Sequence, residues 1–242
     1  MINWEELKHI HVIRKLEEIL SQWFHTEIFF LDERGQVRNY DPTDRQREFK
    51  NPIAATLLPK DKGREWILNE FLVANEKAFK SSVPHLALLG PTGAEQVLVS
   101  RVVVDGEFLG SVLAYSFIER EIPAETRKAA RAKVEALGLD GEAFEFALSR
   151  MKVLSDGERK YLFELVDLVA QEIVTFHTEI TKREDRISAL NDQLGERYSY
   201  DSMIGKAKPM QAMYSLLDKI KNSDSTVMIQ GENGTGKELI AR

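Results

Sequence analysis

The chain has 242 residues, of which 43% are hydrophobic and 30% are charged, and its formal net charge is −6. This composition is typical of a soluble protein with one large or two small domains. No block of basic residues is present, so nothing in this sequence is predicted to hold nucleic acid by neutralising phosphates. Cysteine is absent, which excludes disulfides, thiolate metal sites and thiol redox chemistry.

Targeting and metal signals are also weak. The N-terminal residues lack the pattern of a signal peptide, and no apolar run reaches about 18 residues, so we expect a cytoplasmic protein with no membrane partner. The histidines are scattered without a spacing that suits metal ligation, and no metal site is expected. They are His9, His11, His25, His85 and His177.

The first 80 residues alternate between helix and strand patterns. Apolar residues from Trp4 to Trp23 recur at steps of three and four, which predicts an amphipathic helix to about Ser21 with Asn3 as its N-cap. Residues 26–31 and 36–40 read as two strands of a hairpin around a turn at 32–35. A variable stretch with two prolines then leads into a helix at about 64–80. Its predicted inward residues are Trp66, Ile67, Phe71, Ala74 and Phe79.

A sheet is predicted next from three β-branched and apolar runs, at residues 85–89, 96–104 and 108–117. Residues 90–93 separate the first two runs. Asp105 and Gly106 separate the last two, and Asp-Gly is a strong signal for a two-residue hairpin because both turn positions need positive φ. An antiparallel meander should therefore form the centre of the domain.

Two further helices are expected after the meander. Pro123 should open a helix that runs to Leu137 and ends at Gly138, and a short helix should follow at about 142–151. Residues 1–154 are thus predicted to form an α+β domain with helices packed against one antiparallel sheet.

A long helix should begin at Ser155, because Ser155 and Glu158 have the spacing of a capping box. Two interleaved seven-residue repeats follow and predict a parallel two-chain coiled coil from about 162 to 194 within a signalling helix at 155–198. For the half that ends near Phe176, packing on the preceding domain is an equally good interpretation. The repeats are Val166, Ile173, Ile180, Ile187 and Leu194, and Leu162, Val169, Phe176, Arg183 and Leu190.

The first domain resembles the GAF/PAS class of sensory domains, and in detail the PocR-type domain. The resemblance is carried by the helix at 66–79, the hairpin at 103–110 and the stretch from 134 to 155. It implies a ligand pocket between sheet and helices, although the cysteines common in PocR-type domains are missing. Candidate lining residues are His85, Ser100, Arg101, Tyr115 and Phe117. Each could equally lie in the core or face solvent, and the domain could bind no ligand and only dimerise or dock a partner protein.

A glycine-rich loop carries the clearest chemistry. Residues 226–230 read as a buried strand, and the loop that follows fits the phosphate-binding pattern Gly-x-x-x-x-Gly-Lys. Glycines let backbone amides approach a phosphate, and Lys237 adds a point charge. The predicted nucleotide-binding residues are Gly231, Glu232, Asn233, Gly234, Thr235, Gly236, Lys237 and Glu238.

This C-terminal part, residues 199–242, resembles the start of the AAA+ domain of sigma-54-dependent transcriptional activators. The likeness rests on residues 204–205, 209–211 and 225–242, where Glu238 replaces the usual serine or threonine of the loop. It implies a Walker A loop that binds ATP with Mg²⁺, and it implies RNA polymerase with sigma-54 and enhancer DNA as partners of the parent protein. Because no acidic Walker B strand, arginine finger or sigma-contacting loop follows within these 242 residues, this chain alone is expected not to hydrolyse ATP.

The sequence is therefore interpreted as the signal-sensing, dimerising portion of such an activator. The alternatives are a docking or dimerisation module that tethers a P-loop ATPase without a ligand, and a free-standing nucleotide-binding enzyme. We expect the signal to travel through a change in the long helix near residues 180–187, where Arg183 interrupts the apolar repeat.

Overall fold

The computed structural model describes residues 4–7, 10–41, 44, 47–197, 207–220 and 226–241. The chain forms two compact units, Met1–Ile180 and Thr181–Arg242, which are described separately. The predicted N-cap Asn3 and the segment at 203–205 lie outside the described residues. No helix of the described part is both long and apolar enough to cross a membrane.

The first unit is built on a four-stranded sheet in the order β1-β4-β3-β2, in which all neighbours are antiparallel. The predicted meander is confirmed as β2 (His85–Leu89), β3 (Gln96–Val104) and β4 (Glu107–Phe117). Asp105 and Gly106 have φ values of 52° and 83°, as the hairpin signal required. The first strand, β1 (Glu27–Asp32), completes the sheet beside β4.

The predicted hairpin partner of β1 at residues 36–40 does not form a strand. One isolated bridge joins Leu31 to Val37. Further along the edge of β1, the Asn39 side chain forms hydrogen bonds with the backbone of the strand. Its Oδ1 accepts from Phe30 N at 2.9 Å, and its Nδ2 donates to the Ile28 carbonyl at 2.9 Å. An amide side chain thus satisfies backbone groups that a second strand would have paired.

Strand β4 contains two irregularities that change which way its side chains point. Gln96 and Val97 of β3 pair with Phe117 and Tyr115, so Ser116 is an extra residue on β4. A second register shift lies between Val102 and Val103 of β3. A bulge places two residues opposite one and breaks the alternation of faces.

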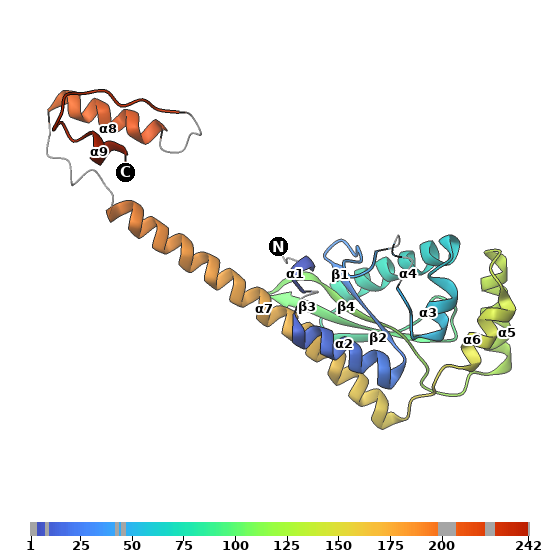
Figure 1. Cartoon of the computed structure of the whole chain (residues 1–242). Coiled ribbons are helices and arrows are strands. Elements are labelled where there is room, and N and C mark those ends of the chain that lie inside the picture. Colours follow the sequence, from blue (N-terminus) through green and yellow to red (C-terminus); the bar gives the residue numbers. More distant parts are fainter. Residues whose placement is uncertain are drawn as a thin grey trace. The chain divides into compact units, whose positions relative to one another are not determined.

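Helices cover both faces of the sheet (Figure 1). One face packs against α1 (Trp4–Leu7), α2 (His11–Phe24) and the first half of α7 (Asp156–Arg197). The other face packs against α3 (Pro52–Leu57) and α4 (Asp61–Lys80), and the same core extends to α6 (Gly141–Ser149), which contacts α3, and to α5 (Ala124–Ala136), which contacts α6. Alternation along β1 explains this, because Ile28 and Phe30 belong to one core and Phe29 and Leu31 to the other. The predicted α+β mixture is confirmed, with the sheet between two helical layers.

Three details of the predicted helices need correction. The opening helix is two helices, α1 and α2, and α2 extends to Phe24 with its last-turn Trp23 63% exposed. Helix α3 was not predicted, because it lies in the stretch that was interpreted as variable, although Pro52 suits the first turn of a helix capped by Asn51. In α4, Phe79 is exposed and Ala78 is the buried residue.

The predicted capping box opens α7. Glu158 N donates to Ser155 Oγ at 3.3 Å, and Ser155 N donates to Glu158 Oε2 at 3.0 Å. The seam residues Leu162, Val166, Val169 and Ile173 are fully buried in the core of their own unit. A two-chain seam starting at 162 is therefore wrong, and packing on the preceding domain is confirmed for this half.

The second unit contains the rest of α7, then α8 (Lys208–Ile220) and α9 (Lys237–Ala241). In its part of α7, Ile187 and Leu190 are 58% and 50% exposed. The buried strand predicted at 226–230 is not formed, and Met228 is 78% exposed. A buried strand needs neighbours in a sheet, and none of the described residues supplies one here.

Candidate functional site

The predicted phosphate-binding loop lies between an extended segment and α9. Gly234 and Gly236 have φ values of +85° and +80°, a conformation that side chains with a Cβ rarely adopt. Thr235 Oγ1 donates to the Glu232 carbonyl at 2.8 Å, and Leu239 N donates to the Gly236 carbonyl at 2.9 Å. These bonds close a compact turn directly before the helix.

Lys237 supplies the positive charge of this loop. Its Nζ donates to the carbonyls of Gly231 and Glu232 at 2.8 and 2.6 Å, so the ammonium folds back over the turn rather than pointing away from it. The glycine conformations and the position of the lysine suit a bound polyphosphate, because that ligand needs an unobstructed backbone and a nearby cation. The residues present therefore fit the phosphate groups of a nucleotide.

The five residues predicted to line a sensory pocket are divided between the two faces of the sheet. His85, Ser100 and Phe117 lie on the α7 face: His85 and Ser100 contact Asp167, and the rings of His85 and Phe117 contact Phe163. Tyr115 belongs to the core on the α4 side, and the Arg101 guanidinium stacks over Phe108, which packs on that same core. The structure therefore does not bring the five together around one cavity.

Asp167 ties the first half of α7 to the sheet. Its carboxylate accepts a hydrogen bond from Ser100 Oγ at 2.6 Å and lies 2.7 Å from His85 Nδ1. Because the serine hydroxyl donates to the carboxylate and not to the imidazole, the three groups do not form a nucleophile activated by a base. They form a polar link between β2, β3 and α7. No spacing pattern in the sequence predicts this link.

A buried carboxylate lies in the turn between β2 and β3. Glu95 is fully buried, and burial raises the pKa of its carboxyl, while hydrogen bonds from Thr92 Oγ1 and Thr92 N act in the opposite direction. Burial, and secondarily the charge of Glu95, also raise the pKa of the Tyr115 hydroxyl well above its ordinary value. Glu95 and Tyr115 thus place a carboxyl and a hydroxyl group inside the protein on the α4 side of the sheet.

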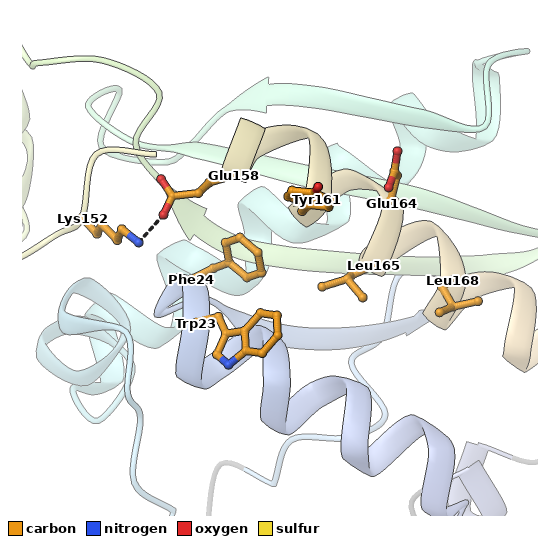
Figure 2. A pocket seen from close by; sticks show the side chains of 8 residues that line it. All are labelled: Trp23, Phe24, Lys152, Glu158, Tyr161, Glu164, Leu165 and Leu168. Atoms are coloured by element: carbon orange, nitrogen blue, oxygen red, sulfur yellow. Dashed lines mark hydrogen bonds and ion pairs between the residues drawn. The ribbon is translucent and has the colours of Figure 1, made fainter. Parts of the chain in front are cut away.

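An open groove of about 620 Å³ lies between α2 and α7 (Figure 2). Trp23 and Tyr161 face it from the two helices, and the Lys152–Glu158 ion pair closes one end. Trp23 belongs to the predicted apolar stripe of the opening helix, but it is exposed and does not join the core. The lining residues are Trp23, Phe24, Lys152, Glu158, Tyr161, Glu164, Leu165 and Leu168.

Comparison with known proteins identifies the C-terminal segment. Residues 203–242 match the family described as the Sigma-54 interaction domain. The chain is 41% identical over 63 residues to the nitrogen fixation protein AnfA of Azotobacter vinelandii, which covers 26% of this chain and 12% of that protein. It is 38% identical over 89 residues to the transcriptional regulator NtrC of Bradyrhizobium sp. (strain RP501 Parasponia), covering 36% and 17%.

A third relative is the formate hydrogenlyase transcriptional activator of Salmonella typhimurium (strain LT2), 35% identical over 98 residues that cover 38% of this chain and 14% of that protein. The chain thus matches less than a fifth of the length of each of these relatives. The predicted resemblance to sigma-54-dependent transcriptional activators is confirmed.

Proposed function

We propose that this chain is the regulatory, signal-sensing portion of a sigma-54-dependent transcriptional activator. The proposal rests on the order of parts in one chain. A mixed helix and sheet unit holds the first half of α7, α7 continues to Arg197, and residues 203–242 match the Sigma-54 interaction domain. A change in the sheet unit would therefore reach α7 before it reached the segment that carries the activator's chemistry.

The proposed cofactor of the parent protein is ATP with Mg²⁺. Residues 231–238 would hold its phosphates, with the ammonium of Lys237 turning from the carbonyls of Gly231 and Glu232 toward them. ATP would supply the free energy for remodelling RNA polymerase bound to sigma-54, and enhancer DNA would be bound by other regions. We place this protein in the cytoplasm, and we expect residues 1–242 alone not to hydrolyse ATP.

The proposed oligomer is a homodimer through the second half of α7. Apolar residues recur there at Ile180, Ile187 and Leu190, and the latter two are exposed. Because the seam residues up to Ile173 already contact their own sheet, a second chain has only the later residues to pair with. We also propose that the first unit is a GAF/PAS or PocR-like domain and that it binds a small-molecule effector.

A second candidate function is protein docking without a small-molecule ligand. The exposed aromatic groove between α2 and α7 favours it, because Trp23 and Tyr161 expose large apolar surface. A thermal-shift screen with small organic metabolites discriminates the two, since a ligand at a hundredfold excess over its Kd stabilises by about 2.7 kcal/mol. Stabilisation by a metabolite supports sensing, and silence across the screen supports docking.

The experiment that tests the main proposal is a reconstituted transcription assay with the full-length protein, RNA polymerase and sigma-54. We expect ATP-dependent transcripts that disappear in Lys237→Ala and persist in the control Lys219→Ala, whose side chain lies exposed at the end of α8. Removal of residues 1–197 should make the transcripts independent of the signal. Equal transcription with and without sigma-54 would refute the proposal.

A further inference from the structure

Three aromatic rings surround one guanidinium group beside the edge of β1 that Asn39 covers. The Cζ atom of Arg47 lies 5.7 Å from the ring centroid of Phe29, 5.2 Å from that of Tyr40 and 5.3 Å from that of Phe49. The rings also contact one another, with centroid distances of 6.1 Å between Phe29 and Tyr40 and 5.9 Å between Tyr40 and Phe49. All three distances to the cation are within the range in which a ring attracts it.

A carboxylate adds negative potential next to this cage. Glu17 of α2 accepts a hydrogen bond from Asn39 Nδ2 at 3.1 Å, and it is close enough for the charge of Arg47 to act on its pKa. Arg47 itself donates from Nη1 to the Asn39 carbonyl at 2.6 Å. The surroundings therefore offer a cation π-faces, a carbonyl acceptor and a nearby acid, which is the chemistry that recognises a guanidinium group.

The walls of the cage are held by contacts that do not involve Arg47. Phe29 is fully buried in β1 and packs on Phe71 with a centroid distance of 5.0 Å. Next to Tyr40, the Asn39 side chain is bonded to the edge of β1. Next to Phe49, the amides of residues 50 and 51 donate to Glu27 Oε1 at 2.7 and 3.0 Å. The cation is thus the one part of the arrangement that could be exchanged without dismantling the rest.

We propose that the cage of Phe29, Tyr40 and Phe49 is a binding site for a small guanidinium compound, and that Arg47 is its internal occupant. An incoming guanidinium displaces the Arg47 side chain and takes its place against the rings and the Asn39 carbonyl. A ligand must compete with a tethered group, so the intact site binds more weakly than the cage without Arg47. Binding of the guanidinium compound to the cage does not depend on the proposed function. A role for that compound as the signal does rest on the proposed function.

The test uses N-propylguanidinium, which has the shape of the missing side chain, and its neutral isostere N-propylurea. Isothermal titration calorimetry on the 242-residue chain should show that Arg47→Ala binds N-propylguanidinium, with N-propylurea about tenfold weaker. The unmodified chain should bind N-propylguanidinium about tenfold more weakly than Arg47→Ala and should still bind it measurably. Adding Phe49→Leu to Arg47→Ala should weaken binding severalfold, because one ring is lost.

Controls make each outcome decisive. Arg150→Ala removes a guanidinium that stacks on a single exposed ring, that of Phe146 at 5.8 Å, and should create no binding. If Arg47→Ala does not fold, Arg47→Gln keeps much of the side-chain volume without the charge. Equal binding of the urea, no binding by either Arg47 variant, or binding by the variants with none by the unmodified chain would each overturn the proposal. Failure of sigma-54-dependent transcription would leave these binding results unaffected.

Discussion

Glu17 makes the stability of the first unit depend on pH. Burial raises the pKa of its carboxyl from the ordinary value of 4.5 to about 6, against the hydrogen bond from Asn39 and the charge of Arg47, which lower it. The folded protein therefore binds a proton at this group more tightly than the unfolded chain does. It follows that the stability contributed by this group is greatest below about pH 4.5 and is lost as the pH rises through about 6.

Glu17→Gln should remove this loss. The amide stays neutral at every pH and can still accept the Asn39 hydrogen bond, so the free energy of unfolding should no longer fall by about 2 kcal/mol as the pH rises from about 4 to about 7. Urea unfolding at a series of pH values measures it. The control is Glu18→Gln, at an exposed carboxylate paired with Lys15, which should leave the fall in place. An unchanged fall in Glu17→Gln would assign the effect to another group.

Gly110 is required by a close backbone approach in β4. It has φ +144°, and a Cβ there would lie 2.1 Å from the Leu31 carbonyl oxygen of the paired strand. Gly110→Ala should therefore force β1 and β4 apart and destabilise the unit by about 3 kcal/mol or more. Gly106→Ala is the matched control, because a Cβ there meets nothing within 4 Å, and it should cost about 1 kcal/mol for its positive φ alone. Thermal unfolding of the two variants gives the comparison, and equal losses would contradict the steric argument.

At the scale of elements, α7 changes its role along its length. Ile173→Asp would bury an unpaired charge in the core beside the sheet, so we expect the first unit to lose about 4 kcal/mol of stability. Ile187→Asp, on the exposed part of the same repeat, should leave the unfolding of the first unit unchanged and weaken the proposed dimer. Circular dichroism melting and sedimentation equilibrium report the two effects separately. An Ile173→Asp variant as stable as the unmodified chain would contradict this prediction, because it would show that packing of α7 at Ile173 does not stabilise the first unit.

Local patterns predicted most elements because their signals are local. The strands of the meander, the capping box and the glycine-rich loop each depend on residues within a few positions of one another. What failed depended on distant partners. Instead of a strand at 36–40, the side chain of Asn39 bonds the edge of β1. The seven-residue repeats predicted an apolar seam on the long helix but did not distinguish packing on the sheet from packing on a second chain.

The site residues follow the same rule. The turn at 231–238, with positive φ at Gly234 and Gly236, could be predicted from its spacing, and its role in phosphate binding stays a prediction. The pocket residues could not be placed on one face. Ser100 and Arg101 are adjacent in β3, so alternation alone separates them. Tyr115 and Phe117 should share a face by that rule, but the extra residue Ser116 sends them to opposite cores. The aromatic cage was missed because Phe29 is distant in sequence from Tyr40 and Phe49.

At the scale of the whole molecule, the apolar repeat on α7 lies in two different environments. Up to Ile173 its residues are buried against their own sheet, whereas Ile187 and Leu190 are exposed. The link from Asp167 to His85 and Ser100 fixes the first part of the helix to the sheet of the first unit. Any rearrangement of β2 or β3 would therefore act on α7 directly, and in the proposed dimer it would change how the later residues of the two helices meet.

Arg183 lies in the middle of that later seam, and its charge should keep the pairing of two chains weak, since a cation at a seam position costs stability unless it reaches solvent or an acid. Arg183→Leu should complete the apolar repeat and tighten the dimer by about tenfold or more, because a buried leucine contributes about 1.5–3 kcal/mol. In the full-length protein the tightened seam should also make ATPase assembly insensitive to the signal. Sedimentation equilibrium measures the first effect, and ATPase activity with and without the signal measures the second. A variant that dimerises more tightly yet responds as the unmodified protein does would show that the signal reaches the ATPase by a route other than α7.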